Sequence, residues 1–150
     1  MRLSPHFSLD ELIQSETATR HGISNQPGPA ELDNLVRLAD VLELVRTLLH
    51  GRPMLISSAY RAPGVNRLVG GSATSDHMSG RAADFICPGF GSPLQVCRAI
   101  DADASIPFEQ LIFEGTWVHL SIAAEGRDVR RQVLTAHFGS GSVTYTSGLP

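Results

Sequence analysis

A histidine and an aspartate seven residues apart, His77 and Asp84, form the first candidate for metal binding in this 150-residue chain. Gly80 stands between them and permits a sharp bend, while Ala82 and Ala83 leave room beside the carboxylate. The segment can therefore fold back so that the imidazole and the carboxylate converge on one point. A His–Asp pair at this spacing is weak evidence for a metal when it stands alone.

The second candidate is His119, in the segment Trp117–Ala123, which we expect to form a β-strand. Side chains alternate between the two faces of a strand, so Val118 and Leu120 share one face and His119 stands on the other. The apolar face is expected to face the core, and the mixed face suits a ligand at the floor of a cleft. Taken alone, an ordinary, partly exposed histidine is the more common explanation of such a pattern.

The two segments together make a stronger case than either one. Two imidazoles and one carboxylate leave the fourth position of a tetrahedral ion to water, which is the arrangement of a catalytic zinc site. Zinc lowers the pKa of that water to roughly 7 and so supplies a nucleophile near neutral pH. A structural zinc would be enclosed by four protein ligands, but Cys87 and Cys97 do not have the spacing of such a site. The sequence therefore predicts Zn²⁺ bound by His77, Asp84 and His119.

Helices are expected early in the chain and strands late, which predicts an α+β fold. The predicted helices cover residues 8–15, 29–49, 63–69 and 92–101, and residues 21–28 are expected to form a loop. The predicted strands cover residues 53–58, 82–86, 110–114, 117–123, 131–138 and 143–146. We expect a mainly antiparallel sheet with the N-terminal helices packed on one face, in a single domain spanning residues 1–150.

Composition excludes several classes of protein. The formal net charge of −3 gives no reason to expect a nucleic-acid partner. No stretch approaches the roughly 20 apolar residues of a membrane span, so membrane insertion is not expected. The first residues lack the apolar core of a signal peptide, which predicts synthesis in the cytoplasm. A substrate outside the membrane would then require release of the protein by another agent.

Several motifs resemble the zinc D-Ala-D-Ala carboxypeptidase family, which shares its fold with the Hedgehog signalling domain. The resemblance runs from about residue 5 to residue 123 and looks closest to short members from phages and prophages. The matching residues are Phe7-Ser8-Leu9-Asp10-Glu11-Leu12, Asn25-Gln26-Pro27, Ser58-Ala59-Tyr60-Arg61, Asn66, Val69-Gly70-Gly71, Ser75-x-His77-x-x-Gly80-x-Ala82-x-Asp84 and Trp117-x-His119.

The resemblance implies roles for individual residues. It makes His77, Asp84 and His119 the zinc ligands and Arg61 the cation that steadies the substrate carbonyl as negative charge develops there. A fixed cation at that point can contribute several kcal/mol, although a surface arginine after a strand is an alternative. By the same resemblance Ser75 lines the substrate cleft, or else its hydroxyl only holds the backbone of its own loop.

The general base is the point where the chain departs from the family. Several branches place an acid three residues before the last histidine ligand, and here that position is Thr116. Glu114 is the nearest acid, and the turn at Gly115 could bring its carboxylate to the zinc-bound water. A solvent-exposed glutamate is the competing interpretation of Glu114, and Asp76 is a weaker substitute for the base because it is expected to point away from His77.

Two classes of function follow from these expectations. The first is a monomeric zinc metallopeptidase that uses zinc-bound water to cleave peptidoglycan stem peptides, as a D-Ala-D-Ala carboxypeptidase or an endopeptidase. It would act on the cell wall after phage-mediated release, as an endolysin does, or as part of a virion. The alternative is a non-catalytic zinc-containing module of a phage tail or lysis system, which the threonine at position 116 motivates.

Overall fold

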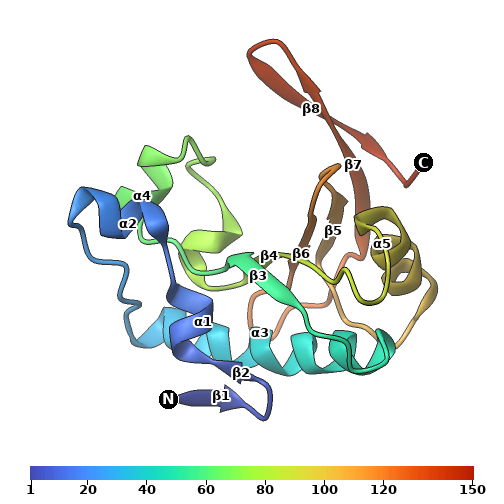
Figure 1. Ribbon diagram of the computed structural model, residues 1–150, viewed down its shortest axis with the longest axis horizontal. Coiled ribbons are helices and arrows are strands. Elements are labelled where there is room, and N and C mark those ends of the chain that lie inside the picture. The colour runs from blue at the N-terminus through green and yellow to red at the C-terminus, as the bar shows by residue number, and fades with distance from the viewer.

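A six-stranded β-sheet forms the centre of the fold, with strand order β3-β4-β6-β5-β7-β8. The computed structural model describes residues 1–150 (Figure 1). The strands are β3 (Leu55–Ser58), β4 (Ala82–Ile86), β5 (Gln110–Phe113), β6 (Val118–Ser121), β7 (Gln132–Gly139) and β8 (Ser142–Ser147). All neighbours pair antiparallel except β5 and β7, which run parallel. The predicted α+β class with a mainly antiparallel sheet is confirmed.

Five α-helices and one short 3₁₀ helix accompany the sheet. They are α1 (Leu9–Ile13), α2 (Glu16–His21), α3 (Pro29–Leu48), α4 (Pro63–Leu68), the 3₁₀ helix η1 (Asp76–Ser79) and α5 (Pro93–Ala102). A two-stranded hairpin of β1 (Arg2–Ser4) and β2 (Phe7–Ser8) precedes α1. None of these helices has the length and apolar character needed to cross a bilayer.

The helix α2 was not expected from the sequence, which placed a helix end near Ser15 and a loop from His21 onward. Ser15 instead begins a second helix, because its side chain accepts a hydrogen bond from the backbone N–H of Ala18 at 3.1 Å. Gly22 ends that helix in the left-handed conformation, with φ of 63°. Ser15 lies two residues after the end of α1 and also caps α2. From the sequence alone, this serine could be taken either as the end of the first helix or as the start of a second one.

The hydrophobic core lies between the sheet and the helices α3 and α5. Leu38 and Leu42 of α3 and Ile100 of α5 are fully buried and belong to one cluster of 25 buried residues that includes Phe85 and Leu120 of the sheet. Burying a leucine or phenylalanine side chain contributes about 1.5–3 kcal/mol each. A core of this size holds the fold without help from a metal ion.

The two faces of the sheet differ in chemistry because side chains alternate along each strand. On the core face, Ala83, Leu120, Leu111 and Val133 are neighbours across four strands. On the opposite face, one row runs from Asp84 through His119, Ile112 and Leu134 to Ser147. The two predicted ligands Asp84 and His119 therefore stand side by side on the face away from the core, as the sequence pattern predicted for His119.

Candidate metal centre

Three predicted ligand residues converge on the sheet face that lies opposite the core. His77, Asp84 and His119 offer ligand atoms that all lie within 4.8 Å of one another. His77 Nε2 is 3.3 Å from Asp84 Oδ2, and His119 Nδ1 is 2.9 Å from Asp84 Oδ1. Zinc–ligand bonds of about 2.0–2.2 Å would place tetrahedral ligand atoms about 3.3 Å apart, so this donor set fits a zinc ion.

No fourth histidine, cysteine, aspartate or glutamate joins this group, and no other group of three such residues occurs in the chain. Cys87 and Cys97 are buried as free thiols elsewhere in the core. Three protein donors with no fourth are the arrangement of a catalytic site, whereas a structural zinc is enclosed by four.

A glycine-dependent turn brings His77 back to Asp84. Gly80 ends η1 with φ of 77°, a conformation that side-chain-bearing residues rarely adopt. A Cβ atom at Gly80 would also lie 2.6 Å from the backbone oxygen of Glu31 in α3. Only glycine fits there, and the chain then enters β4, which carries Asp84 next to His119 of β6.

The orientation of His77 is set by a backbone carbonyl. Its Nδ1 donates to the oxygen of Ala59 at 2.6 Å, which leaves Nε2 to face Asp84 and a metal. The side chain is only 3% exposed, and this burial lowers the pKa of His77 against the opposing effect of Asp84. A lowered pKa keeps the imidazole neutral near pH 7, as a metal ligand must be.

Asp84 carries the negative charge of the centre. Burial raises its pKa, but the hydrogen bonds and charges of His119 and His77 outweigh burial and hold the pKa well below its usual range. The carboxylate is therefore ionised across the physiological pH range and can accept a divalent cation.

Arg61 follows β3 and is half-buried beside the centre. It takes part in no ion pair of the chain, and its buried Nε has no hydrogen-bond partner. Burial lowers the pKa of Arg61 while the charge of Asp84 opposes that effect, which shows that the two groups lie within electrostatic reach. A buried donor without a partner is costly unless a ligand or water uses it, and the contact of Arg61 with substrate stays a prediction.

Next to Arg61, the side chain of Asn66 is buried and holds the following loop. Its Nδ2 donates to the backbone oxygen of Ser72 at 2.9 Å, while its Oδ1 has no partner. A Cβ at Gly71 would lie 2.0 Å from this Oδ1 and 3.1 Å from Arg61 Nη1. Gly71 therefore allows the loop to close over both side chains.

Ser75 caps η1 from its N-terminal side. Its hydroxyl accepts a hydrogen bond from the backbone N–H of His77 at 3.2 Å. The structure thus shows the hydroxyl holding its own loop, which was one of the two interpretations of this serine. A contact between Ser75 and substrate stays a prediction.

Glu114 follows β5 directly and shares the face of the metal ligands. Ile112 of β5 pairs with His119 and therefore faces the same side of the sheet. Glu114 follows Ile112 by two residues, and residues two apart along a strand share a face. Gly115, with φ of 82°, forms the turn to β6, and the Glu114 backbone N–H donates to Trp117. Burial raises the pKa of Glu114, and the charge of Asp84 raises it further against the opposing effect of His119. Glu114 is therefore partly buried and near the centre, rather than a freely solvated acid.

The other two candidates for the general base lie in less suitable surroundings. Thr116 is exposed in the turn after Glu114, and its hydroxyl cannot serve as a base at neutral pH. Asp76 pairs with Arg81 at 3.5 Å, which agrees with the expectation that it points away from His77.

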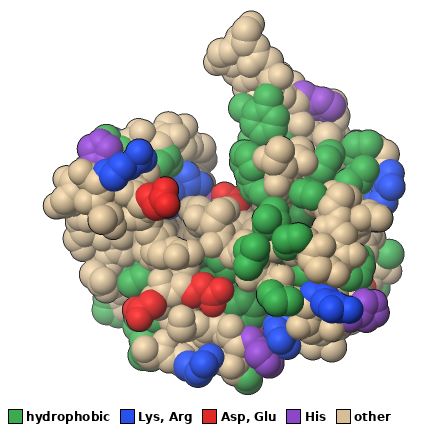
Figure 2. Space-filling view, in the orientation of Figure 1, with side chains coloured by type: hydrophobic (Ala, Val, Ile, Leu, Met, Phe, Trp, Pro, Cys, Tyr) green, Lys and Arg blue, Asp and Glu red, His purple; other side chains and the backbone are tan.

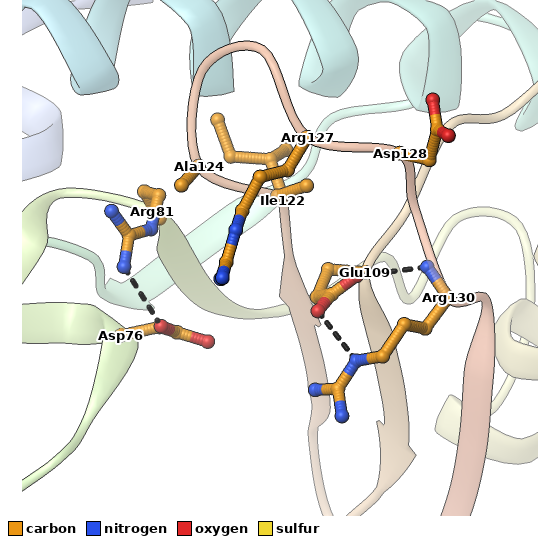
Figure 3. Close-up of a pocket in the computed structure, with 9 residues that line it drawn as sticks. Asp76, Arg81, Glu109, Ile122, Ala124, Arg127, Asp128 and Arg130 are labelled. Carbon is orange, nitrogen blue, oxygen red and sulfur yellow. Dashed lines mark hydrogen bonds and ion pairs between the residues drawn. The ribbon is translucent and has the colours of Figure 1, made fainter.

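A separate polar pocket of about 560 Å³ lies at the other end of the sheet (Figure 3). Its charged side chains largely neutralise one another, through Arg81 with Asp76 and through Arg130 Nε with Glu109 Oε2 at 2.7 Å. None of the three ligands of the metal centre lines this pocket. It is distinct from the site that carries the predicted chemistry.

The fold and the centre together give an α+β protein with two histidines and one carboxylate placed where they could bind a metal ion. The sequence model of the peptidase M15 family matches residues 5–121, and the chain belongs to this family. A comparison with curated proteins finds no match. The family consists of zinc enzymes, and the donor set fits that ion, so the chain carries the metal centre of a zinc metallopeptidase.

Sequence reasoning missed two features around the centre. The Ala59 carbonyl that orients His77 is a backbone group, so no residue type signals it. Tyr145 of β8 lies close enough to Glu114 and Asp84 that their charges help raise its pKa, after the larger effect of burial. The alternation of Val143 and Tyr145 with threonines indicated a strand, but nothing local placed that strand beside the centre.

Proposed function

We propose that the protein hydrolyses peptide bonds in peptidoglycan stem peptides. The observation that carries this proposal is the three-donor group His77, Asp84 and His119, which lacks a fourth protein ligand and has Arg61 and Glu114 beside it. The resemblance of its motifs to D-Ala-D-Ala carboxypeptidases supports the choice of substrate class.

A zinc ion held by His77, Asp84 and His119 supplies a Lewis acid that activates water near neutral pH and polarises a carbonyl group. The neutral imidazole of His77 and the ionised carboxylate of Asp84 are the protonation states that bind such an ion. Because Ala59 holds the His77 ring, the ligand atom is already oriented before the ion arrives.

Glu114 is the general base in this proposal. Its carboxylate takes a proton from the attacking water and then passes it to the amine that leaves. A base works best when its pKa lies near the working pH, and partial burial raises the pKa of Glu114 in that direction. The turn at Gly115 points the end of β5 toward the cleft without a hydrogen bond that would tie the carboxylate down.

Arg61 stabilises the substrate carbonyl oxygen as it becomes negative. Its guanidinium is half-buried, unpaired and near the Asp84 carboxylate. A cation in a site that excludes water interacts more strongly with developing charge than one in bulk solvent. The guanidinium needs no rearrangement to do this, because no other group of the chain competes for it.

The decisive experiment is digestion of purified bacterial sacculi with zinc-loaded protein. We expect the release of free amine groups, and we expect a chelator to stop it and added zinc to restore it. Mass spectrometry of the products then separates a terminal D-Ala-D-Ala cleavage from cleavage of a cross-link or of an L-Ala-D-Glu bond. Failure to release any amine from sacculi or isolated stem peptides, with one zinc bound per chain, would falsify the proposal.

The second candidate function is a non-catalytic zinc module, which the threonine at position 116 favours. It predicts stoichiometric zinc without hydrolysis, and a Glu114→Gln variant that behaves like the wild type in every assay. Loss of amine release in Glu114→Gln with zinc retained decides for the enzyme. We also propose that the protein acts as a monomer, which size-exclusion chromatography can test. We propose further that a phage releases it, which the neighbouring genes can test.

A further inference from the structure

The β7–β8 hairpin lies outside the part of the chain that matches the family. The match ends at residue 121, and β7 begins at Gln132. In Figure 1 the hairpin extends well beyond the rest of the molecule, and α2 and α4 lie on the other side of the view. Figure 2 shows a deep notch between these two walls, with hydrophobic side chains gathered on the hairpin side.

The register of the sheet shows which hairpin residues face this notch. Leu134 of β7 stands in the same row as Ile112, His119 and Asp84. Further along the hairpin, on the same face, Ala136 pairs with Tyr145 and Phe138 pairs with Val143. The apolar face of the hairpin is therefore a direct continuation of the face that carries the metal ligands.

These hairpin side chains are exposed although they are large and apolar. Phe138 is 57% exposed, Tyr145 51% and Val143 43%. The Phe138 ring lies 6.1 Å from the ring of Trp117, which precedes β6 two residues before His119. We call these four residues the aromatic strip. Apolar groups that are clustered and unburied beside a reaction centre commonly mark a binding surface.

The opposite face of the same hairpin is polar. It carries Thr144 paired with His137, and Thr146 paired with Thr135. His137 Nε2 lies 2.8 Å from the Thr146 hydroxyl. This face points away from the metal ligands, and it is exposed at His137, Thr144 and Thr146, whereas Thr135 is buried.

Distance determines which part of a substrate the strip can reach. Three strand spacings separate β6 from β8 in the sheet order, which at about 4.8 Å each gives roughly 14 Å. An extended peptide spans about 3.3–3.6 Å per residue, so the surface from His119 to the β8 backbone has room for roughly four residues, and Trp117 and Tyr145 lie at its inner end. A terminal dipeptide would cover only this inner end, whereas a stem peptide would cover the whole strip.

We propose that the aromatic strip of Trp117, Phe138, Val143 and Tyr145 binds the residues of the stem peptide that extend from the scissile bond toward the hairpin, through their methyl and methylene groups. The inference rests on the proposed function and adds a preference for extended peptides over short ones. The strip has no formal charge, and it is continuous with the face of the metal ligands, so it can pack against the alanine methyl groups and the methylene chains of a stem peptide.

The kinetic test compares two substrates that share the scissile bond and differ by three residues in length. In the wild type we expect the longer peptide to have the higher kcat/KM. The double variant Phe138→Ala/Tyr145→Ala should lower the ratio of long to short kcat/KM by about tenfold, mostly through KM, since about two aromatic contacts are lost. Thr144→Ala, on the polar face of the same strand, is the matched control and should leave the ratio within twofold. An unchanged ratio in the double variant would overturn the proposal.

A binding test separates this inference from the proposed function. Zinc-loaded Glu114→Gln protein is sedimented with intact sacculi and with glycan strands stripped of their peptides. When Phe138→Ala and Tyr145→Ala are added to Glu114→Gln, the protein should lose most of its binding to sacculi. When Thr144→Ala is added instead, the binding should be retained. If the wild type hydrolyses nothing, this result still decides whether the strip binds peptide. Equal binding of both variants, or a loss that is as large on peptide-free glycan, would contradict the proposal.

Discussion

The cleft floor and the β7–β8 hairpin share one face of one sheet but are built in opposite ways. On the floor, His77 is buried and Asp84 is only 15% exposed, and hydrogen bonds to Ala59 and His119 hold the two side chains. On the hairpin, Phe138 is more than half exposed, and its ring lies beside that of Trp117. Chemistry needs ligand atoms fixed to within a fraction of an ångström, whereas recognition of a long, flexible substrate needs area and tolerates motion.

The family match follows the same division. It covers Arg61, His77, Asp84, Glu114 and His119 and stops before the hairpin begins. The residues of the metal centre lie inside the part that matches the M15 family, and the exposed hairpin lies beyond it. Variants in the two regions should therefore separate the catalytic step from substrate preference.

The largest effect is expected from removing a ligand on the floor. His77→Ala, Asp84→Ala and His119→Ala should each abolish stoichiometric zinc binding, measured by metal analysis, and lower hydrolysis by more than about 10³-fold. Far-ultraviolet circular dichroism should remain close to that of the wild type, because the 25-residue core does not include the metal. An unfolded metal-free protein would instead show that the site is structural.

Glu114→Gln should lower kcat by about 10²–10⁴-fold, because the amide cannot accept the proton of water. Zinc content should not change, since Glu114 lies outside the ligand group. Glu114→Asp serves as the conservative comparison and should keep part of the activity. A fully active Glu114→Gln variant would move the general base to another residue.

The pH dependence of kcat should reflect the same carboxylate. Glu114 must be ionised to act as a base, and its raised pKa means that it becomes protonated at a higher pH than an ordinary glutamate. Activity should therefore decline as the pH falls through this raised pKa, with the midpoint above the usual range of about 4.3. The residual activity of Glu114→Gln should lack this decline, and an unaltered acidic limb in that variant would assign it to another group.

Arg61→Ala should lower kcat by roughly 10–10²-fold with zinc retained, because one stabilising cation is lost from the transition state. Arg61→Lys is the matched control and should recover only part of the rate, since a lysine cannot reproduce the planar guanidinium. A change confined to KM would show that Arg61 binds the ground state instead.

The smallest effect on the fold is expected at the hairpin. Phe138→Ser should change the free energy of unfolding by less than about 1 kcal/mol, because an exposed side chain loses little burial. Gly80→Ala on the floor should cost about 2–4 kcal/mol, since the new Cβ is forced against the Glu31 carbonyl and into an unfavourable φ. Urea unfolding of both variants measures the contrast, and similar losses would show that the hairpin is part of the core.

Much of the fold was predictable because its elements carry local signals. Ser92 caps α5 with a reciprocal capping box to Gln95, and Pro29 begins α3 as expected. The predicted strands at residues 82–86, 117–123 and 143–146 also formed, as β4, β6 and β8, and for β6 the alternation of side chains gave the correct faces. The helix α2 was missed because six residues carry too little periodicity to be distinguished from a loop. The parallel pairing of β5 with β7 was missed because pairing partners leave no mark on either strand alone.

For the site, the sequence by itself determined which donors exist and on which face of a strand His119 stands. Side-chain type and the two-residue period of a strand are local properties, so they can be read without knowing the fold. Only the tertiary structure decided that the ring of His77 is turned by Ala59 and that the row from Asp84 leads on to the aromatic strip. Both depend on contacts between segments far apart in the chain, and long-range register follows from the packing of the whole sheet rather than from any single segment.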